Sequence, residues 1–202
     1  MTPFFSVAWR RYIGLIAVVL QVFLAASCSS ITTRLQIIEA ITRGEERGHY
    51  IPSVPFIYQK DKRCGTAALA SVLRYYGDPI TEELIARDIF SPELKGTLIS
   101  DLENFARRRG FYTCVYPGSL SDLKRHIERN EPVIILIDEG VSVYQRPHYL
   151  VAVGYSEKRR LVVVHTGTEA DALWSYGRLE SAWARMNYLC LFIMPLSKAI
   201  EE

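Results

Sequence analysis

Three polar residues stand where their types and spacing allow thiol chemistry: Gln59, Cys64 and His148. Cys64 begins an alanine-rich apolar stretch that predicts a buried helix, and the positive end of a helix stabilises a thiolate and lowers its pKa. His148 opens the apolar stretch HYLVAVGY, where an imidazole can activate the thiol and later protonate a leaving amine. Gln59, just before the cysteine, can donate its amide N–H to an oxyanion together with the Cys64 backbone N–H.

Each residue also has a purely structural explanation when it is taken alone. A cysteine in an apolar helix is often a small buried hydrophobe, and a histidine at a strand edge or a surface glutamine often has no catalytic role. Cys114 and Cys190 lie in the apolar segments FYTCVYP and YLCLFIMP, which predict strands with buried thiols. No two cysteines have the spacing of a zinc or redox motif, and no carboxylate cluster indicates a metal. We therefore expect no metal and no cofactor.

The elements that must position these residues divide into a helical first half and a strand-rich second half. Gly77 and Gly110 follow apolar periodic stretches as helix stops, and Thr81 and Ser119 precede such stretches as helix caps. Continuous apolar runs then predict buried strands. The expected strands include PVIILI, HYLVAVGY, RLVVVHTG and YLCLFIMP, with a short helix from about Tyr176 before the last of them. Helices first and a mostly antiparallel sheet later predict the α+β class.

The amino-terminal segment has the three-part layout of a secretory signal. Arg10 and Arg11 precede an uncharged run, and the small residues 25–27 precede Cys28. A cysteine directly after small residues resembles the bacterial lipoprotein signal, in which that thiol carries the lipid. We therefore expect Cys28 to be the lipid attachment site, and the protein to be a lipoprotein anchored in the membrane of the cell envelope, on the periplasmic side. The alternatives are an uncleaved anchor helix and a twin-arginine export signal.

Composition and boundaries narrow the function further. We divide the chain into a signal at 1–27, a tether with a short helix at 28–50, a globular domain at 51–197 and a tail at 198–202. The 202 residues carry a formal net charge of +2 without a basic block, which excludes nucleic acid as the main partner. No phosphate-binding Gly-x4-Gly-Lys-Ser/Thr loop is present, so we do not expect an ATP-driven exporter.

The stretch VPFIYQKDKRCGTAALASVLRYYG, taken together with PVIILI and PHYLVAVGY, resembles the papain-like family of double-glycine-leader (bacteriocin-processing) peptidases. The resemblance covers about residues 51–195 and is closer to the stand-alone bacterial lipoprotein relatives than to the exporter-fused forms. It implies a papain-like cysteine peptidase fold with a buried nucleophile helix packed on the sheet. It also implies that Cys64 is the nucleophile, His148 the general base and Gln59 the oxyanion donor, acting on a peptide or protein substrate.

One position departs from that family, in which an Asp or Asn on the next strand orients the catalytic imidazole. At about that place this chain has His165, with Thr166 beside it. A neutral imidazole can accept a hydrogen bond but supplies no negative charge, so His165, Thr166 or a backbone carbonyl must hold His148. We expect an envelope-anchored cysteine peptidase-like hydrolase. The alternatives are a catalytically weak or silent peptide-binding module of the same fold, and an amidase acting on cell-wall material.

Overall fold

The computed structural model describes residues 33–141 and 143–201. The expected signal at 1–27 and the expected lipid site at Cys28 lie outside these residues. The chain separates into two compact units, Met1–Ala40 and Ile41–Glu202. Residues 33–42 are helical. In the part of the chain that the structure describes, no helix combines the length and the apolar character needed to cross a membrane.

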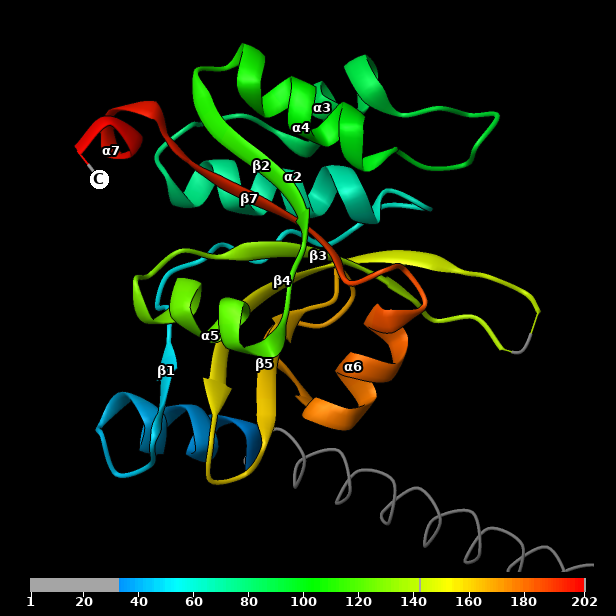
Figure 1. Cartoon of the computed structure of the whole chain (residues 1–202). Coiled ribbons are helices and arrows are strands. Elements are labelled where there is room, and N and C mark those ends of the chain that lie inside the picture. Colours follow the sequence, from blue (N-terminus) through cyan, green and yellow to red (C-terminus); the bar gives the residue numbers. More distant parts are fainter. Residues whose placement is uncertain (1–32, 142, 202) are drawn as a thin grey trace, which may run out of the picture. The chain divides into compact units, whose positions relative to one another are not determined.

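The second unit is built on one seven-stranded sheet in which every paired strand is antiparallel (Figure 1). The strand order is β2-β7-β3-β4-β5-β6, and β1 pairs with the second half of β4. The strands are β1 (Gly48–Tyr50), β2 (Phe111–Pro117), β3 (Val133–Asp138), β4 (Pro147–Ser156), β5 (Leu161–His165), β6 (Ala172–Ser175) and β7 (Leu189–Pro195). Together with the helices this arrangement confirms the α+β class.

Helices cover both faces of the central strands (Figure 1). α2 (Cys64–Tyr75), α3 (Glu82–Ile89) and α4 (Ile99–Arg108) pack together on one side; α5 (Leu120–Glu128) and α6 (Tyr176–Ala184) lie on the other; α7 (Leu196–Glu201) follows β7. All six residues of β3 are therefore buried, as expected for a strand that is covered on both faces. β4, the neighbour of β3 that carries His148, is buried from its third residue onward.

α2 is the most enclosed helix of this unit. Its residues 65–73 are all buried, and its alanines let β4 pack close to the helix backbone. Gly77 and Gly110, at φ values of 89° and 85°, end α2 and α4 in the left-handed conformation that glycine adopts readily. The side chains of Thr81 and Ser119 accept hydrogen bonds from backbone N–H groups at the starts of α3 and α5. The stops and caps expected from the sequence are present.

Three short elements were not expected from the sequence. β1 and β6 have only three and four residues, too few for a readable alternation of apolar and polar side chains. β1 lies in the expected tether, so the sheet begins before residue 51, and α7 lies partly in the expected tail. The boundaries at residues 51 and 197 stay predictions.

Gly65 is the point of close approach between α2 and β4. A Cβ at this position would lie 2.2 Å from Thr97 Oγ1 and 3.1 Å from the Tyr149 ring. We predict that Gly65→Ala lowers the free energy of unfolding by about 1–3 kcal/mol in urea denaturation, because the core must shift to admit the methyl group. The control is Gly177→Ala in α6, where a Cβ meets nothing within 4 Å. Equal losses in both variants would contradict the tight contact.

Candidate active site

Cys64 is the first residue of α2, and nothing caps the helix in front of it. Arg63 occupies the N-cap without a side-chain hydrogen bond, and the first turn contains no acidic residue. The N–H groups of the first turn have no acceptor within the helix, so they keep their positive potential for a group outside it. The thiol is half-buried and lies on the wall of a cleft. This setting favours a thiolate.

The ring of His148 lies within hydrogen-bonding reach of the Cys64 sulfur. Burial alone would raise the pKa of the thiol, but the hydrogen bond and charge of His148, with backbone hydrogen bonds from Tyr149 and Gly65, lower it below its usual range. Burial alone would lower the pKa of His148, but its interaction with Cys64 outweighs this and raises that pKa. The two shifts have opposite signs, as in a thiolate–imidazolium pair.

The far side of the His148 ring faces a backbone carbonyl. Nε2 of His148 donates to the carbonyl oxygen of Thr166 over 2.7 Å, which leaves Nδ1 for the sulfur of Cys64. The Thr166 side chain is used elsewhere, because its Oγ1 accepts the N–H of Glu169 at 3.0 Å and so closes the turn after β5. The group that holds the imidazole is therefore the Thr166 main chain.

His165 lies near this site but forms no hydrogen bond to His148. Its Nε2 donates to the Val54 carbonyl over 3.1 Å, and its Nδ1 accepts the N–H of Asp171 over 3.2 Å. Burial lowers the pKa of His165, and it outweighs the Val54 carbonyl and the Asp171 charge, which both act to raise that pKa. The ring is only 5% exposed and both of its nitrogens are occupied. In this structure His165 ties the segment before α2 to the loop after β5.

Asp138 shapes the hairpin that delivers His148, and the sequence analysis did not single it out. Its Oδ1 accepts the N–H groups of Gly140 and Arg146, both over 2.7 Å, and these bonds help to lower the pKa of a carboxyl group that is only 2% exposed. Arg185 of the loop after α6 approaches Oδ2 to 3.5 Å. An Asp-x-Gly sequence at the end of a buried strand is typical of such a turn. This pattern could have predicted the role of Asp138 from the sequence.

Glu139 places a negative charge beside His148. In the β3–β4 register Ile137 lies opposite His148, and the N–H of Glu139 donates to the Arg146 carbonyl over 3.0 Å. Glu139 is therefore a diagonal cross-strand neighbour of His148, within reach of a long side chain. Its charge is among the causes that raise the pKa of His148, after the hydrogen bond and charge of Cys64. The family pattern places an Asp or Asn on the following strand, whereas this acid belongs to the preceding hairpin.

Gln59 lies on the wall of the same cleft with a free amide nitrogen. Its backbone N–H donates to the Gly167 carbonyl over 2.7 Å, and its Oε1 is buried against Gly167 without a hydrogen-bond partner. The amide nitrogen is not among the buried unpaired atoms and bonds to no described residue. Gln59 therefore keeps an amide N–H group that no described residue uses, on a side chain that lines the same cleft as Cys64.

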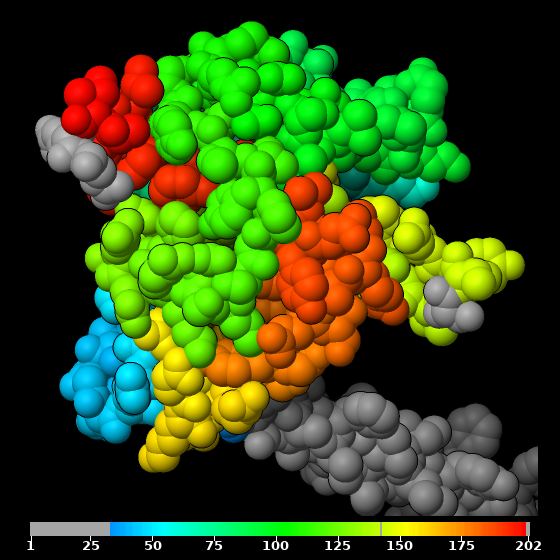
Figure 2. All heavy atoms as spheres, viewed as in Figure 1, coloured from blue at the N-terminus to red at the C-terminus, as the bar shows by residue number. Residues whose placement is uncertain are grey.

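The cleft that holds these groups has a volume of about 1160 Å³. It is lined by residues 58–62, 94–100 and 145–149, together with Cys64 and several others. We call residues 90–98, between α3 and α4, the arm. Figure 2 shows this arm and the hairpin that joins β3 to β4 projecting on the same side of the molecule, with a hollow between them. Among the described residues no group of three or more His, Cys, Asp or Glu side chains is arranged to hold a metal ion.

This combination of a thiol at the start of a buried helix and a histidine at the start of a sheet strand defines a cysteine-peptidase type of fold and site. The sequence matches the Peptidase_C39 like family over residues 51–191, and the chain belongs to that family. This confirms the family resemblance found in the sequence. Among curated proteins, none matches the chain.

Solved structures agree with this assignment at the level of the fold. The peptidase domain of Streptococcus ComA is 23% identical with a TM-score of 0.59, and the match covers 70% of this chain and 98% of that domain. A putative C39-like peptidase from Bacillus anthracis is 16% identical with a TM-score of 0.60, covering 74% and 98%. A double glycine motif protease from an AMS/PCAT transporter is 21% identical with a TM-score of 0.56, covering 74% and 95%. The papain-like fold class is thereby confirmed.

Glu139→Gln tests the contribution of this carboxylate to the charge of His148. Removing a negative charge disfavours the imidazolium, so the pKa of His148 falls. We expect the His148 resonances in an NMR pH titration, assigned with a His148→Asn variant, to reach their midpoint at lower pH than in the wild type. The control is Asp61→Asn, which removes an acid of the same cleft that is not among the causes of the His148 shift. An unmoved midpoint in Glu139→Gln would show that the carboxylate does not act on the ring.

Proposed function

We propose that the protein is a cysteine peptidase that cleaves a peptide bond through an acyl-thioester on Cys64. One observation carries the proposal. His148 lies within hydrogen-bonding reach of the Cys64 sulfur on one side and donates to the Thr166 carbonyl on the other, on the wall of an open cleft. A buried structural thiol would need neither the charge pairing nor the access.

The proposed reaction uses only groups in this cleft. The Cys64 thiolate attacks the substrate carbonyl carbon, a C–S bond forms, and the carbonyl oxygen becomes an oxyanion that accepts the Cys64 N–H and the Gln59 amide N–H. The His148 imidazolium gives its Nδ1 proton to the leaving nitrogen as the C–N bond breaks. Neutral His148 then takes a proton from water, whose oxygen attacks the thioester and releases the acid, and the ion pair returns.

The Thr166 carbonyl can support both halves of this cycle. It accepts the Nε2 proton of His148, which the ring keeps in its charged and its neutral form. In the neutral form the Nδ1 lone pair is then the one directed at the water or the thiol. The carbonyl thus fixes the tautomer that a base needs, while Glu139 supplies negative charge when the ring is protonated.

We propose a peptide or protein segment as the substrate. A volume of about 1160 Å³ accommodates several residues of an extended chain, and the cleft lies between two projecting arms. One structural relative, the double glycine motif protease, was solved in complex with a leader peptide.

We also propose that the enzyme is attached to the membrane of the cell envelope through a lipid on Cys28. The sequence supports this through the basic, apolar and small-residue layout of its first 27 residues. When cells that express the chain are grown with a radiolabelled fatty acid, the wild-type protein should incorporate the label and the Cys28→Ser variant should not. Equal labelling of both proteins would exclude this anchor.

Cleavage of a peptide library by the full chain, read by mass spectrometry, tests the peptidase proposal. The wild type should produce discrete cuts that Cys64→Ala abolishes.

Gln59→Ala should reduce kcat by about 10²–10³ while peptide binding remains, because the lost donor acts on the oxyanion. Iodoacetamide should label Cys64 at a pH well below that at which a free cysteine reacts. Peptide binding without cuts would instead favour the silent binding module.

A further inference from the structure

The walls of the cleft carry an excess of positive charge. The charged residues that line it are four cations, Lys60, Lys62, Lys95 and Arg146, and one acid, Asp61. All four cations are exposed. Lys60 is already paired, because its Nζ lies 2.5 Å from Glu83 Oε1. The other three form no ion pair with any residue that the structure describes, so their charges are open to a ligand.

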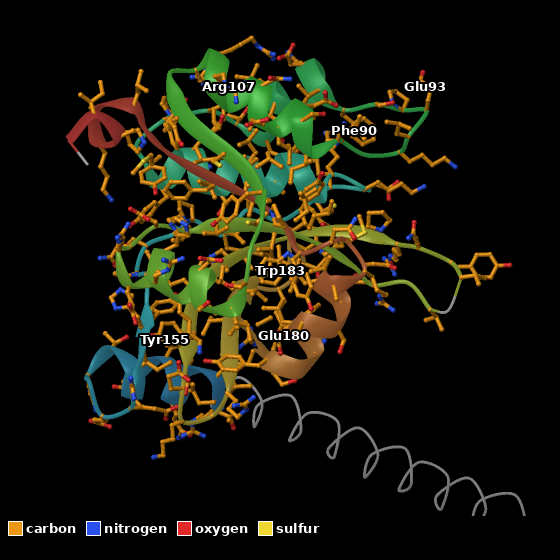
Figure 3. The ribbon with its side chains drawn as sticks, in the orientation of Figure 1. Phe90, Glu93, Arg107, Tyr155, Glu180 and Trp183 are labelled. Atoms are coloured by element: carbon orange, nitrogen blue, oxygen red, sulfur yellow. The ribbon has the colours of Figure 1, made fainter. Side chains whose placement is uncertain are left out.

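The three unpaired cations come from three separate segments of the cleft wall. Lys62 lies two residues before Cys64, Lys95 belongs to the arm between α3 and α4, and Arg146 lies two residues before His148 on the β3–β4 hairpin. Glu93, an acid of the same arm as Lys95, is not part of the cleft wall and points away from the hollow (Figure 3). A chain bound in the cleft at Cys64 therefore lies against a wall that carries positive charge on three segments.

The backbone under each of these cations is fixed. Lys62 and Lys95 have φ values of 55° and 52°, a left-handed conformation that glycine adopts more readily than lysine. Lys95 sits in a closed turn in which Ser91 and Gly96 exchange both backbone hydrogen bonds, at 2.9 and 3.2 Å. The N–H of Arg146 is bonded to Asp138. The side chains thus leave the wall from defined points.

We propose that Lys62, Lys95 and Arg146 select peptides that carry acidic side chains close to the scissile bond. This inference rests on the proposed peptidase function and names the substrate class of that site. Carboxylates of such a peptide replace the ion-pair partners that the three cations lack. The cations are exposed, so the selection acts mainly on association and weakens with ionic strength.

Alkylation of Cys64 by a charged and a neutral reagent tests the field of these cations without any peptide. Iodoacetate carries a carboxylate and iodoacetamide does not, so the ratio of their rates at Cys64 reports the local potential. In the full chain, the triple variant Lys62→Gln, Lys95→Gln, Arg146→Gln should lower that ratio about threefold or more at low salt. The control is the charge-preserving triple variant Lys62→Arg, Lys95→Arg, Arg146→Lys, which keeps all three positive charges and should leave the ratio near the wild-type value. An unchanged iodoacetamide rate shows that the triple variant keeps a folded, activated Cys64.

Matched peptides then test the selection itself. Two peptides that contain a library cleavage site and differ only by Glu or Gln beside it are compared by kcat/KM. The wild type should prefer the Glu peptide at low salt, and the triple variant should lose the preference. Equal values for the two peptides in the wild type, or an unchanged alkylation ratio in the triple variant, would overturn the proposal. A lowered ratio with no peptide cleaved would refute the peptidase function and leave the charged cleft established.

Discussion

The contact between the start of α2 and the start of β4 is the constraint on which the site depends. Cys64 and His148 are far apart in the sequence, and each has an ordinary structural explanation when considered alone. They meet because α2 is buried along most of its length and because Gly65 lets the Tyr149 ring lie against the helix backbone. The helix thereby places its uncapped end beside the start of β4, a central strand of the sheet. The alanine-rich sequence of α2 thus sets the position of the Cys64 thiol beside His148 as well as building the core.

The charges of Cys64 and His148 are set by two opposing effects, which are partial burial and the interaction of the two groups with each other. Burial disfavours both the thiolate and the imidazolium, yet both are favoured here because each offsets the burial of the other. The Thr166 carbonyl and Glu139 add to the same balance from two further elements. A carboxylate on the strand after His148 is therefore not the only arrangement that can orient and charge this ring. The role of such a carboxylate is divided between a carbonyl that fixes the tautomer and an acid that acts through space.

The sequence predicted those parts that rest on local signals. The helix at Cys64, the strand at His148 and the glycine stops arise from periodicity and turn chemistry, and the structure has them. The sequence did not decide which group faces the far nitrogen of His148, because that depends on the register of β4 against β5. β4 contains a bulge between Ala152 and Gly154, where it has one residue more than β5. A pairing of β4 with β5 that is counted residue by residue from their connecting turn is therefore wrong by one position near His148. Glu139 was missed because its position beside His148 exists only once the β3–β4 hairpin has formed.

Two layers of charge in this cleft differ in how strongly the solvent screens them. The Cys64 and His148 side chains are half-buried and lie within hydrogen-bonding reach of each other, so dissolved salt affects their interaction little. The proposed selecting cations are exposed side chains that act over longer distances, where a physiological Debye length of about 8 Å removes much of their effect. Within the proposed function, ionic strength should then change which peptides reach the thiolate far more than it changes the chemistry that follows. Such a separation lets the rim of the cleft vary without disturbing the pair at its base.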